Sequence, residues 1–302
     1  MTYVGRFAPS PTGPLHIGSL TTAVASFLHA KQFSGEWLVR IEDIDPPREV
    51  SGAADQILRT LEAFELPWDR PILYQSTRLA VYRETADALV RDGHAFRCGC
   101  TRRALRATGK LQATRYPGTC RNKTQHQRVT AIRARVEPGE QTYVDGLQGP
   151  RTSDLSAILG DYVIFRRDGL PAYHLATVVD DAAQGVTTVV RGVDLLQSTA
   201  AHRHLQATLG VRTPDYFHLP VVTNAFGQKL SKQTKAKPVD ITAARIVAVR
   251  VLEYLGLTVP RALIGASPGT LWDWAIANWQ IDVLKGKKHW LEVELVDAAK
   301  VD

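Results

Sequence analysis

The sequence predicts an α/β fold with a doubly wound parallel sheet, because the same order of strand and helix occurs twice. A short apolar run at residues 3–7 is followed by a proline-rich loop, a helical pattern from His16, and a second apolar run at residues 36–42. A strand at residues 186–191 and a helix at residues 195–209 repeat this order. Strand–helix–strand units of this kind build parallel sheets, which bind ligands beyond the carboxyl ends of their strands.

The loop after the first strand predicts an anion site. Pro9, Pro11 and Pro14 prevent helix formation, so the chain stays extended until the helix begins at His16. The N–H groups and the dipole at the start of that helix point toward the loop. Gly18 in the first turn lets a ligand approach the backbone closely.

The remaining elements follow from apolar spacing and from turn residues. We expect a hairpin at residues 162–173 that turns at Asp168-Gly169 and leads into a helix beginning near Tyr173. Residues 130–151 are expected to form short strands and turns, and residues 216–222 a single strand. Four further helices are predicted, at residues 51–65, about 76–91, 241–257 and 271–278.

Composition limits the class of protein. The chain has 302 residues, 44% of them apolar, which is ordinary for a globular protein. No apolar run approaches the roughly 20 residues of a membrane span, and no signal-peptide pattern precedes the first strand. We therefore expect a cytoplasmic protein that does not enter a membrane.

Positive charge is concentrated in one segment. The chain carries a net charge of +7, whereas residues 91–135 alone carry twelve Lys or Arg and a single acid, Asp92. The segment therefore has a charge of +11 and the rest of the chain −4. Such a field favours binding to a phosphate backbone, with a solvated basic surface as the alternative.

The three cysteines, Cys98, Cys100 and Cys120, all lie in this basic segment. Their odd number argues against a disulfide framework, and their spacing suits a small loop held by zinc. The alternative is three unrelated buried thiols. By chemistry alone His94, His126 or a water are candidates for a fourth ligand.

Two motifs and an acidic run together resemble a known family. The run Arg6-Phe-Ala-Pro-Ser-Pro-Thr-Gly-Pro-Leu-His-Ile-Gly18 resembles the first signature of class I aminoacyl-tRNA synthetases of the glutamyl and glutaminyl branch. Arg40-Ile-Glu-Asp-Ile-Asp45 matches the same branch, and Lys229-Leu-Ser-Lys232 resembles the second class I signature. A lysine pair alone is weak evidence, but these motifs together are specific.

The resemblance implies glutamate activation by ATP, with Mg²⁺ accompanying the nucleotide. His16 and Lys232 would be catalytic, because phosphoryl transfer needs positioning and positive charge. Glutamate carries two carboxylates and one ammonium, which two arginines and one acid complement. The implied glutamate-binding residues are Arg6, Phe7, Ala8, Pro9, Ser10, Glu42, Tyr173 and Arg191. The implied ATP-binding residues are Ser10, Thr12, His16, Gly18, Ser19, Lys229, Ser231 and Lys232.

The resemblance covers residues 3–235 and is strongest to truncated paralogues of glutamyl-tRNA synthetase that act on queuosine at the wobble position of tRNA(Asp). In them a Tyr-x-x-x-Cys pattern implies Tyr116 as the fourth ligand of one structural Zn²⁺, beside Cys98, Cys100 and Cys120. Lys-Leu-Ser-Lys-Gln and a length that leaves no room for an anticodon-binding domain point the same way. We expect a monomer whose basic segment contacts the tRNA.

These expectations divide the chain into four parts. Residues 1–92 and 156–225 would form the two halves of a Rossmann-like catalytic domain, and residues 93–155 an inserted zinc-binding subdomain. Residues 226–302 would hold the Lys-Leu-Ser-Lys loop and a short helical stem-contact region. Three alternatives remain: a short glutamyl-tRNA synthetase that charges the tRNA 3′ end, an inactive RNA-binding or sensor paralogue, and another nucleotidyltransferase.

Overall fold

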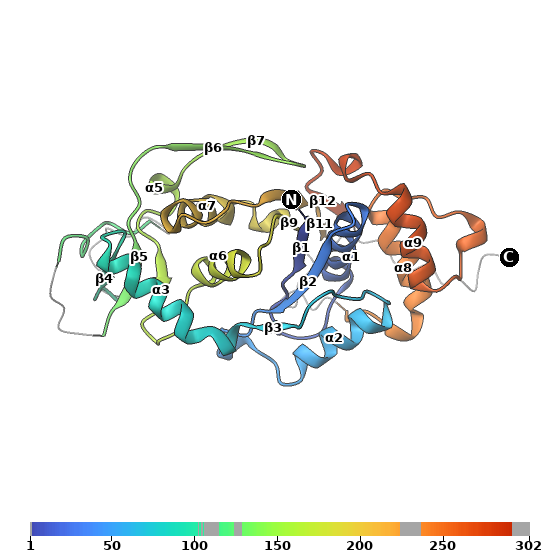
Figure 1. The fold of residues 1–302 in the computed structure, drawn as a ribbon, viewed down its shortest axis with the longest axis horizontal. Helices are drawn as coiled ribbons and strands as arrows, with labels where there is room; N and C mark the ends of the chain where they lie inside the picture. Colours follow the sequence, from blue (N-terminus) through green and yellow to red (C-terminus); the bar gives the residue numbers. More distant parts are fainter. Residues whose placement is uncertain are drawn as a thin grey trace.

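The chain forms a mixed α/β structure in which parallel strands occupy the middle of the molecule (Figure 1). Helices α8 (Ala244–Tyr254) and α9 (Pro268–Asn278) lie at one end, and an antiparallel region lies at the other. The computed structural model describes residues 2–101, 103, 105, 115–123, 129–223 and 237–291. Across these residues we find no helix with the length and apolar character that crossing a bilayer requires.

The first parallel block confirms the predicted strand–helix–strand unit. Strand β1 (Val4–Phe7) leads through the proline-rich loop to α1 (Ile17–Gln32), and β2 (Glu36–Ile41) pairs in parallel with β1. Strand β3 (Leu73–Tyr74) extends the sheet on the other side of β2. Because α1 is buried along most of its length, it anchors the loop that precedes it.

The second parallel block confirms the repeated pattern. Strands β9 (Thr188–Gly192) and β10 (Asp215–Leu219) pair in parallel, with α7 (Ser198–Leu209) between them in the chain and α6 (Tyr173–Ala183) before them. The Thr187 amide donates to the Val4 carbonyl over 2.9 Å, so the second block lies beside β1. Residues at or just after the carboxyl ends of β1, β2, β9 and β10 line one cavity, so these four ends lie at the same edge.

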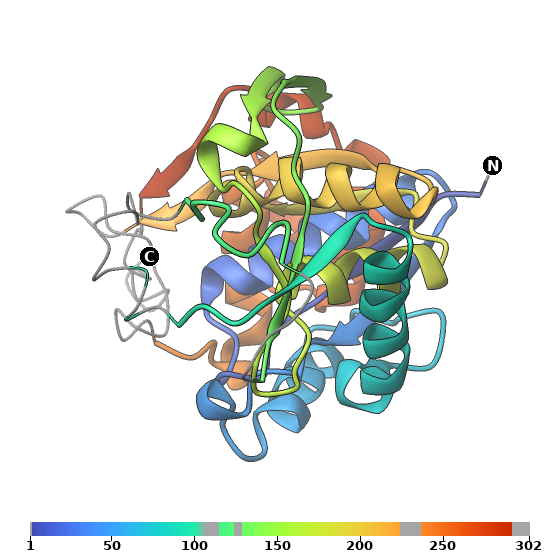
Figure 2. The same cartoon turned by 90° about the vertical axis from the view of Figure 1, so that its left-hand side faces the viewer.

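An antiparallel sheet stands at the other end of the molecule, in the foreground of Figure 2. It contains β4 (Ala95–Cys98), β5 (Ala131–Ala134) and β8 (Val163–Phe165). Phe165 bridges to Pro171 around the predicted Asp-Gly turn, where Gly169 has a φ of +89°. A turn of this kind favours glycine, and it directs the chain into α6 at Tyr173.

A two-stranded arm links the antiparallel end with the C-terminal part. Strands β6 (Glu140–Asp145) and β7 (Gly149–Asp154) run along the upper edge of Figure 1 and lead into α5 (Leu155–Ile158). At its tip, Gln148 Nε2 donates to the carbonyls of His218 and Lys287 over 2.9 and 2.8 Å. The arm thus docks on the end of β10.

The buried apolar side chains form two large clusters. One joins α1, β2, α2 (Ala53–Ala63), α8 and α9, and the other joins α3 (Leu79–Arg91), β5, β8, α6 and α7. The antiparallel strands therefore share a core with the helices of the second parallel block. Burial of each large aliphatic side chain stabilises this arrangement by about 1.5–3 kcal/mol. A third, small cluster contains Phe96, Cys98, Leu105, Tyr116 and Cys120.

Two predicted elements need correction. The single strand expected at residues 216–222 is wrong, because Pro220 separates β10 from a further strand, β11 (Val221–Thr223). Proline has no N–H to continue the ladder. Strand β11 pairs instead with β12 (His289–Leu291), an element that was not predicted. The helix expected at residues 195–209 is preceded by a 3-10 turn at Val193–Leu195, and α7 starts only at Ser198.

Candidate active site and cysteine cluster

A cavity of about 520 Å³ opens at the carboxyl ends of β1, β2 and β9, next to the start of α1. Every described residue that was assigned to glutamate or ATP lines it. These are Arg6, Phe7, Ala8, Pro9, Ser10, Thr12, His16, Gly18, Ser19, Glu42, Tyr173 and Arg191. Lys229, Ser231 and Lys232 lie outside the described residues.

The side chain of Arg6 is bound by the buried carboxylate of Asp181. Arg6 is 4% exposed, and its Nε donates to Asp181 Oδ1 over 3.3 Å. Arg40 Nη1 reaches the same oxygen over 2.8 Å. Burial opposes ionisation of Asp181, but Arg6 and Arg40 outweigh it and lower the pKa of that carboxyl. Arg6 is therefore fixed as a cation facing the cavity.

Glu42 is the acid of the cavity. Its backbone N–H donates to the Pro9 carbonyl over 3.0 Å, which ties the end of β2 to the proline-rich loop. Its Oε1 accepts from Arg40 Nη2 and Thr177 Oγ1, each over 3.4 Å. Burial raises the pKa of Glu42, while Arg40 and Arg6 oppose the rise. A cationic group of a ligand would add to that opposition.

Arg191 lies across the cavity on β9 and donates at all three nitrogens. Nη1 donates to Tyr173 Oη over 3.3 Å and to His202 Nδ1 over 3.2 Å. Nη2 donates to the Leu195 carbonyl and to Thr199 Oγ1. Burial raises the pKa of Tyr173, which keeps its hydroxyl protonated next to the guanidinium.

The start of α1 forms the other wall. His16 is the N-cap residue, and its Nδ1 accepts the Ser19 N–H over 3.3 Å. A Cβ at Gly18 would lie 3.2 Å from the His16 ring and 3.4 Å from Val222. Glycine thus keeps the first turn of α1 open to the cavity. A helix start that carries no acid in its first turn suits a phosphate.

Sequence reasoning missed several residues of the site. The supporting residues Arg40 and Asp181 carried a signal, because a charge within an apolar strand and an acid within a partly apolar helix must pair when buried. For the remaining wall residues no signal in the sequence stood out. The wall residues missed are Leu15, Thr22, Arg48, Val190, Gly192, Asp194, Leu195, Pro220, Val221 and Val222.

A second cavity, of about 1250 Å³, adjoins the first. Both are lined by Arg48 and by three glutamate-assigned residues, Ser10, Glu42 and Tyr173, so the two cavities meet at the proposed glutamate pocket. The opposite wall comes from the segment between Cys98 and Cys120, which we call the cysteine loop, and from the turn after β8. Its lining is rich in arginine and contains Arg48, Arg133, Arg166 and Arg167.

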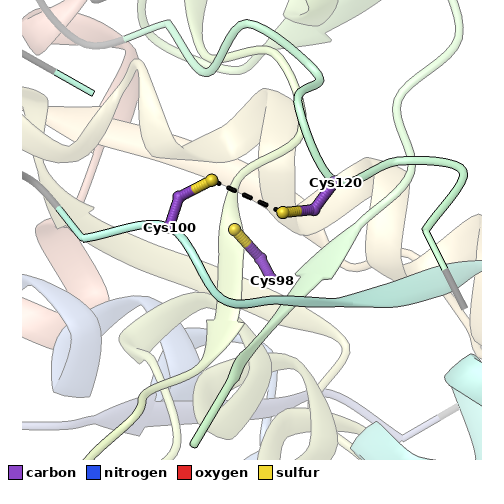
Figure 3. Close-up of side chains that lie close together, drawn as sticks. All are labelled: Cys98, Cys100 and Cys120. Atoms are coloured by element: carbon purple, nitrogen blue, oxygen red, sulfur yellow. Dashed lines mark hydrogen bonds between the residues drawn. The ribbon is translucent and has the colours of Figure 1, made fainter. Parts of the chain in front are cut away.

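The sulfur atoms of the three cysteines converge (Figure 3), and Cys100 lines this second cavity. Their sulfur atoms lie within 4.8 Å of one another, and Cys100 and Cys120 are 3.4 Å apart. A group of thiols this close matches what soft-metal sites need. Arg167 Nη2 donates to the carbonyls of Gly99 and Cys100, which fixes the loop against the turn after β8.

Tyr116 faces the same point. Its hydroxyl lies 3.3 Å from Cys98 Sγ and 3.7 Å from Cys100 Sγ, and accepts the Cys120 N–H over 2.8 Å. Burial and the neighbouring thiols raise the pKa of this phenol, so a cation would be needed to ionise it. His94 is exposed and outside the thiol group, and His126 lies outside the described residues.

This arrangement suits a particular chemistry. Two buried arginines and one acid at strand ends complement a ligand with two anionic groups and one cationic group. The adjoining helix start complements a phosphate. Three thiols and a phenol complement a metal with no open position, which is a structural role.

The sequence matches one family model and many curated proteins. A model described as the catalytic domain of class I tRNA synthetases (E and Q) matches residues 3–258. The glutamyl-Q tRNA(Asp) synthetase of Chromobacterium violaceum is 52% identical over 282 residues, covering 92% of this chain and 94% of that protein. The protein of the same name from Dechloromonas aromatica is 48% identical over 287 residues, covering 93% and 95%.

Solved structures resemble this fold. The glutamate-tRNA synthetase of Elizabethkingia anophelis aligns with a TM-score of 0.82 and 24% identity, over 98% of this chain and 69% of that one. A glutamate tRNA ligase from Elizabethkingia meningosepticum, crystallised in complex with its amino acid, aligns with a TM-score of 0.78 and 25% identity. That alignment covers 96% of this chain and 67% of the other.

Proposed function

Because the chain belongs to the class I tRNA synthetases for glutamate and glutamine, and among them to the glutamyl-Q tRNA(Asp) synthetases, we propose a two-step ligase reaction. ATP activates L-glutamate to glutamyl-adenylate without tRNA, and glutamate then passes to queuosine at the wobble position of tRNA(Asp). The observation that carries the proposal is the single cavity that brings Arg6, Glu42 and Arg191 next to the start of α1.

In the first step the charges of the cavity bind glutamate. Arg6 and Arg191 bind its two carboxylates, and Glu42 binds its ammonium. Tyr173, beside Arg191, and the backbone of residues 7–10 complete the pocket. Asp181 supports this assignment, because it fixes the Arg6 guanidinium toward the cavity before substrate arrives.

Adenylate formation makes one bond and breaks another. A carboxylate oxygen of glutamate attacks the α-phosphorus of ATP, and the bond to the pyrophosphate oxygen breaks. Ser10, Thr12, Gly18 and Ser19 contact ATP, with Mg²⁺ on its phosphates. His16 with Lys232, and Lys229 with Ser231, supply donors and positive charge to the phosphate oxygens. The open first turn of α1 supports this role.

In the second step a hydroxyl of queuosine attacks the carbonyl carbon of the adenylate, and AMP leaves with the bonding electron pair while the hydroxyl loses its proton. The second cavity is our candidate for the entry of the nucleoside, because it meets the glutamate pocket at Ser10, Glu42 and Tyr173. Its arginines, Arg133 and Arg167 among them, suit the phosphates on either side of a flipped base.

We assign one structural Zn²⁺ to Cys98, Cys100, Tyr116 and Cys120. The convergence of three sulfurs and one phenol oxygen supports this ligand set. When bound, zinc would join the two ends of the cysteine loop. The protein residues then hold that loop against the second cavity, through the hydrogen bonds that Arg167 donates.

We also propose that the chain divides into four functional segments. Residues 1–92 and 156–225 form the catalytic halves, residues 93–155 the zinc-bearing insertion, and residues 226–302 the loop with Lys232 and the stem-contact region. The pairing of β8 with β5 supports a close connection between insertion and catalytic half. We propose a monomer that meets its tRNA in the cytoplasm.

The test separates the two steps. Purified protein should catalyse ATP–pyrophosphate exchange that depends on glutamate and needs no tRNA. It should then transfer labelled glutamate to tRNA(Asp) that contains queuosine, and not to the same tRNA prepared without it. Absence of exchange would favour an inactive paralogue instead.

A second candidate is a glutamyl-tRNA synthetase that charges the tRNA 3′ end. The similarity to the two Elizabethkingia structures is the observation that favours it. Unmodified tRNA(Glu) distinguishes the candidates, because only this second enzyme would charge it.

A further inference from the structure

A buried chain of three side chains stands behind Arg191. Arg191 and His218 are direct neighbours on the paired strands β9 and β10, and Arg191 Nε donates to His218 Nε2 over 3.0 Å. On the other side of the imidazole, His218 Nδ1 and Asp145 Oδ2 are 2.5 Å apart. His218 is 0% exposed and Asp145 1%. Neither residue lines the cavity.

The donors and acceptors of this chain permit one arrangement. An arginine has no acceptor, so His218 Nε2 must accept its proton and Nδ1 must carry the imidazole N–H toward Asp145. Thr199 Oγ1 lies 3.2 Å from the same Nε2 and accepts from Arg191 Nη2, so its hydroxyl can donate to Nε2 in this arrangement. Asp145 Oδ1 is committed to the amides of Leu147, Gln148 and His218, at 3.1, 2.8 and 3.3 Å. Only Oδ2 is left to accept from Nδ1.

The charges agree with this arrangement. Burial opposes ionisation of Asp145, but the hydrogen bonds from His218 and from the backbone lower the pKa of the carboxyl. Burial also lowers the pKa of His218, against the raising effect of Asp145. A carboxylate and a neutral imidazole therefore lie behind the Arg191 cation.

We propose that Asp145 and His218 are positioning residues, which fix the Nε edge of Arg191 so that its Nη1 edge faces Tyr173 and the glutamate carboxylate. The inference rests on the proposed function, because it assigns a purpose to Arg191 as a glutamate ligand. Asp145 selects the imidazole tautomer, and the tautomer selects the orientation of the guanidinium. The arm β6–β7, whose first strand ends at Asp145, thus contributes to a cavity that its residues do not line.

Asp145→Asn tests the tautomer directly. The three amides at Oδ1 hold the amide oxygen of the variant in place, so its NH₂ group faces His218 Nδ1. The imidazole proton then moves to Nε2, where it opposes the Arg191 N–H. A misaligned buried donor of this kind should raise KM for glutamate by about 10-fold to 100-fold. KM for ATP should stay within about twofold.

Two substitutions at His218 provide the rescue. His218→Gln keeps an acceptor that can reach Arg191 Nε, and it should have a lower KM for glutamate than His218→Leu, which has none. Equal KM values for these two variants would overturn the proposal. Asp161→Asn is the matched control, because Asp161 is a buried acid whose carboxylate accepts the Val136 amide and pairs with Arg121. It should leave KM for glutamate unchanged.

A measurement on the wild-type protein avoids any dependence on folding of the variants. With ¹⁵N-labelled histidine, the His218 signal, assigned by its absence in His218→Gln, should show a protonated Nδ1 and an unprotonated Nε2 at pH 7.5. The opposite tautomer, or an imidazolium, would overturn the proposal even if exchange is normal. Loss of exchange in the wild type with the expected tautomer would instead refute the proposed function alone.

Discussion

At the scale of single residues, the cavity is a set of charges that are each fixed from behind. Asp181 contacts Arg6 directly, and Asp145 acts on Arg191 through His218. Both supporting acids are buried, so neither can compete with a ligand from the cavity side. A guanidinium held in one orientation loses less entropy when it binds a carboxylate. The guanidinium groups of Arg6 and Arg191 are therefore already oriented toward the cavity before a ligand binds.

Glu42 supplies the first prediction at this scale. Glu42→Gln removes the negative charge that would pair with the ammonium of glutamate. A lost charge-assisted hydrogen bond of about 1.5–3 kcal/mol corresponds to a rise of about 10-fold to 100-fold in KM for glutamate. KM for ATP, measured in the same pyrophosphate exchange assay, should change little. An unchanged KM for glutamate would contradict the assignment of Glu42.

The same variant carries a pH signature. Burial raises the pKa of Glu42 above that of an ordinary carboxyl, so the charged form is lost as pH falls through this raised value. KM for glutamate should therefore rise toward acidic pH more steeply in the wild type than in Glu42→Gln. The comparison removes the titration of glutamate itself, which affects both proteins equally. Parallel profiles would show that Glu42 does not titrate at the site.

Substitution of Gly18 should weaken ATP binding without lowering the stability of the protein. Gly18→Ala places a methyl group 3.2 Å from the His16 ring, at the open first turn of α1. Alanine is also the better helix former, by up to about 1 kcal/mol. We expect an unchanged or higher unfolding midpoint together with a several-fold higher KM for ATP. Gly52→Ala is the converse control, because Gly52 has a φ of +74° and open space around it. It should lower stability and leave KM for ATP alone.

At the scale of elements, Arg167 links the turn after β8 to the segment that carries the cysteines, by donating to the carbonyls of Gly99 and Cys100. Cys100→Ser should abolish binding of one zinc per chain, measured by elemental analysis after reloading, and should lower the unfolding midpoint. Transfer to tRNA should fall more than pyrophosphate exchange, because the loop borders the second cavity. A wild-type protein that retains no zinc would contradict this prediction.

Substitution of Tyr116 tests a single atom of the proposed zinc ligand set. Tyr116→Phe keeps the ring under the Arg133 guanidinium, which lies 3.9 Å from the ring centroid, and removes only the oxygen. Zinc affinity should fall, because the variant lacks the oxygen that we assign as the fourth ligand. An unchanged affinity would contradict that assignment. Tyr162→Phe is the matched control for Tyr116→Phe. Tyr162 is another buried tyrosine, and its hydroxyl donates to the Ala201 carbonyl rather than facing the cysteines.

The elements themselves were predictable to different degrees. Strand β1, helix α1 and strand β2 follow from local apolar patterns and from the prolines between them. The break between β10 and β11 follows from Pro220, which the apolar run around it concealed. Strand β12 exists because β11 offers it an edge some 70 residues earlier in the chain. Such a pairing depends on tertiary contact and leaves little trace in a local pattern.

At the scale of the whole molecule, the same distinction applies to the site. The family resemblance implied Arg6, Glu42 and Arg191 as glutamate ligands, and each stands at the end of a predicted strand, where parallel sheets bind ligands. The structure brings them to one cavity. Asp145 was not singled out, because it approaches Arg191 only through the docking of the β6–β7 arm on β10. The residues that face a ligand follow from strand order, whereas the residues that support them follow from packing between distant segments.

Among the described residues of the basic segment (residues 91–135), some cationic side chains support the fold and others are exposed to solvent. Arg121 and Arg135 support the insertion itself, since Arg121 pairs with Glu137 and Arg135 donates to the Arg121 carbonyl over 2.7 Å. Arg115 and Lys123 are exposed in the same region. Of these four described residues, Arg115 and Lys123 can be reversed without breaking the contacts of Arg121 and Arg135, so they are the ones that report on RNA contact.

The last prediction compares Arg115→Glu/Lys123→Glu with Arg59→Glu/Arg212→Glu. Both double variants change the net charge by the same amount at exposed positions, but Arg59 lies on α2 and Arg212 precedes β10, both outside residues 91–135. If the insertion contacts the tRNA backbone, the first variant should weaken transfer to tRNA(Asp) and flatten its salt dependence. The expected loss in the slope of log K against log salt is about 0.7–0.9 per phosphate contact removed. Glutamate-dependent exchange should be equal in all three proteins. Equal salt slopes in the two variants would place the RNA on another face.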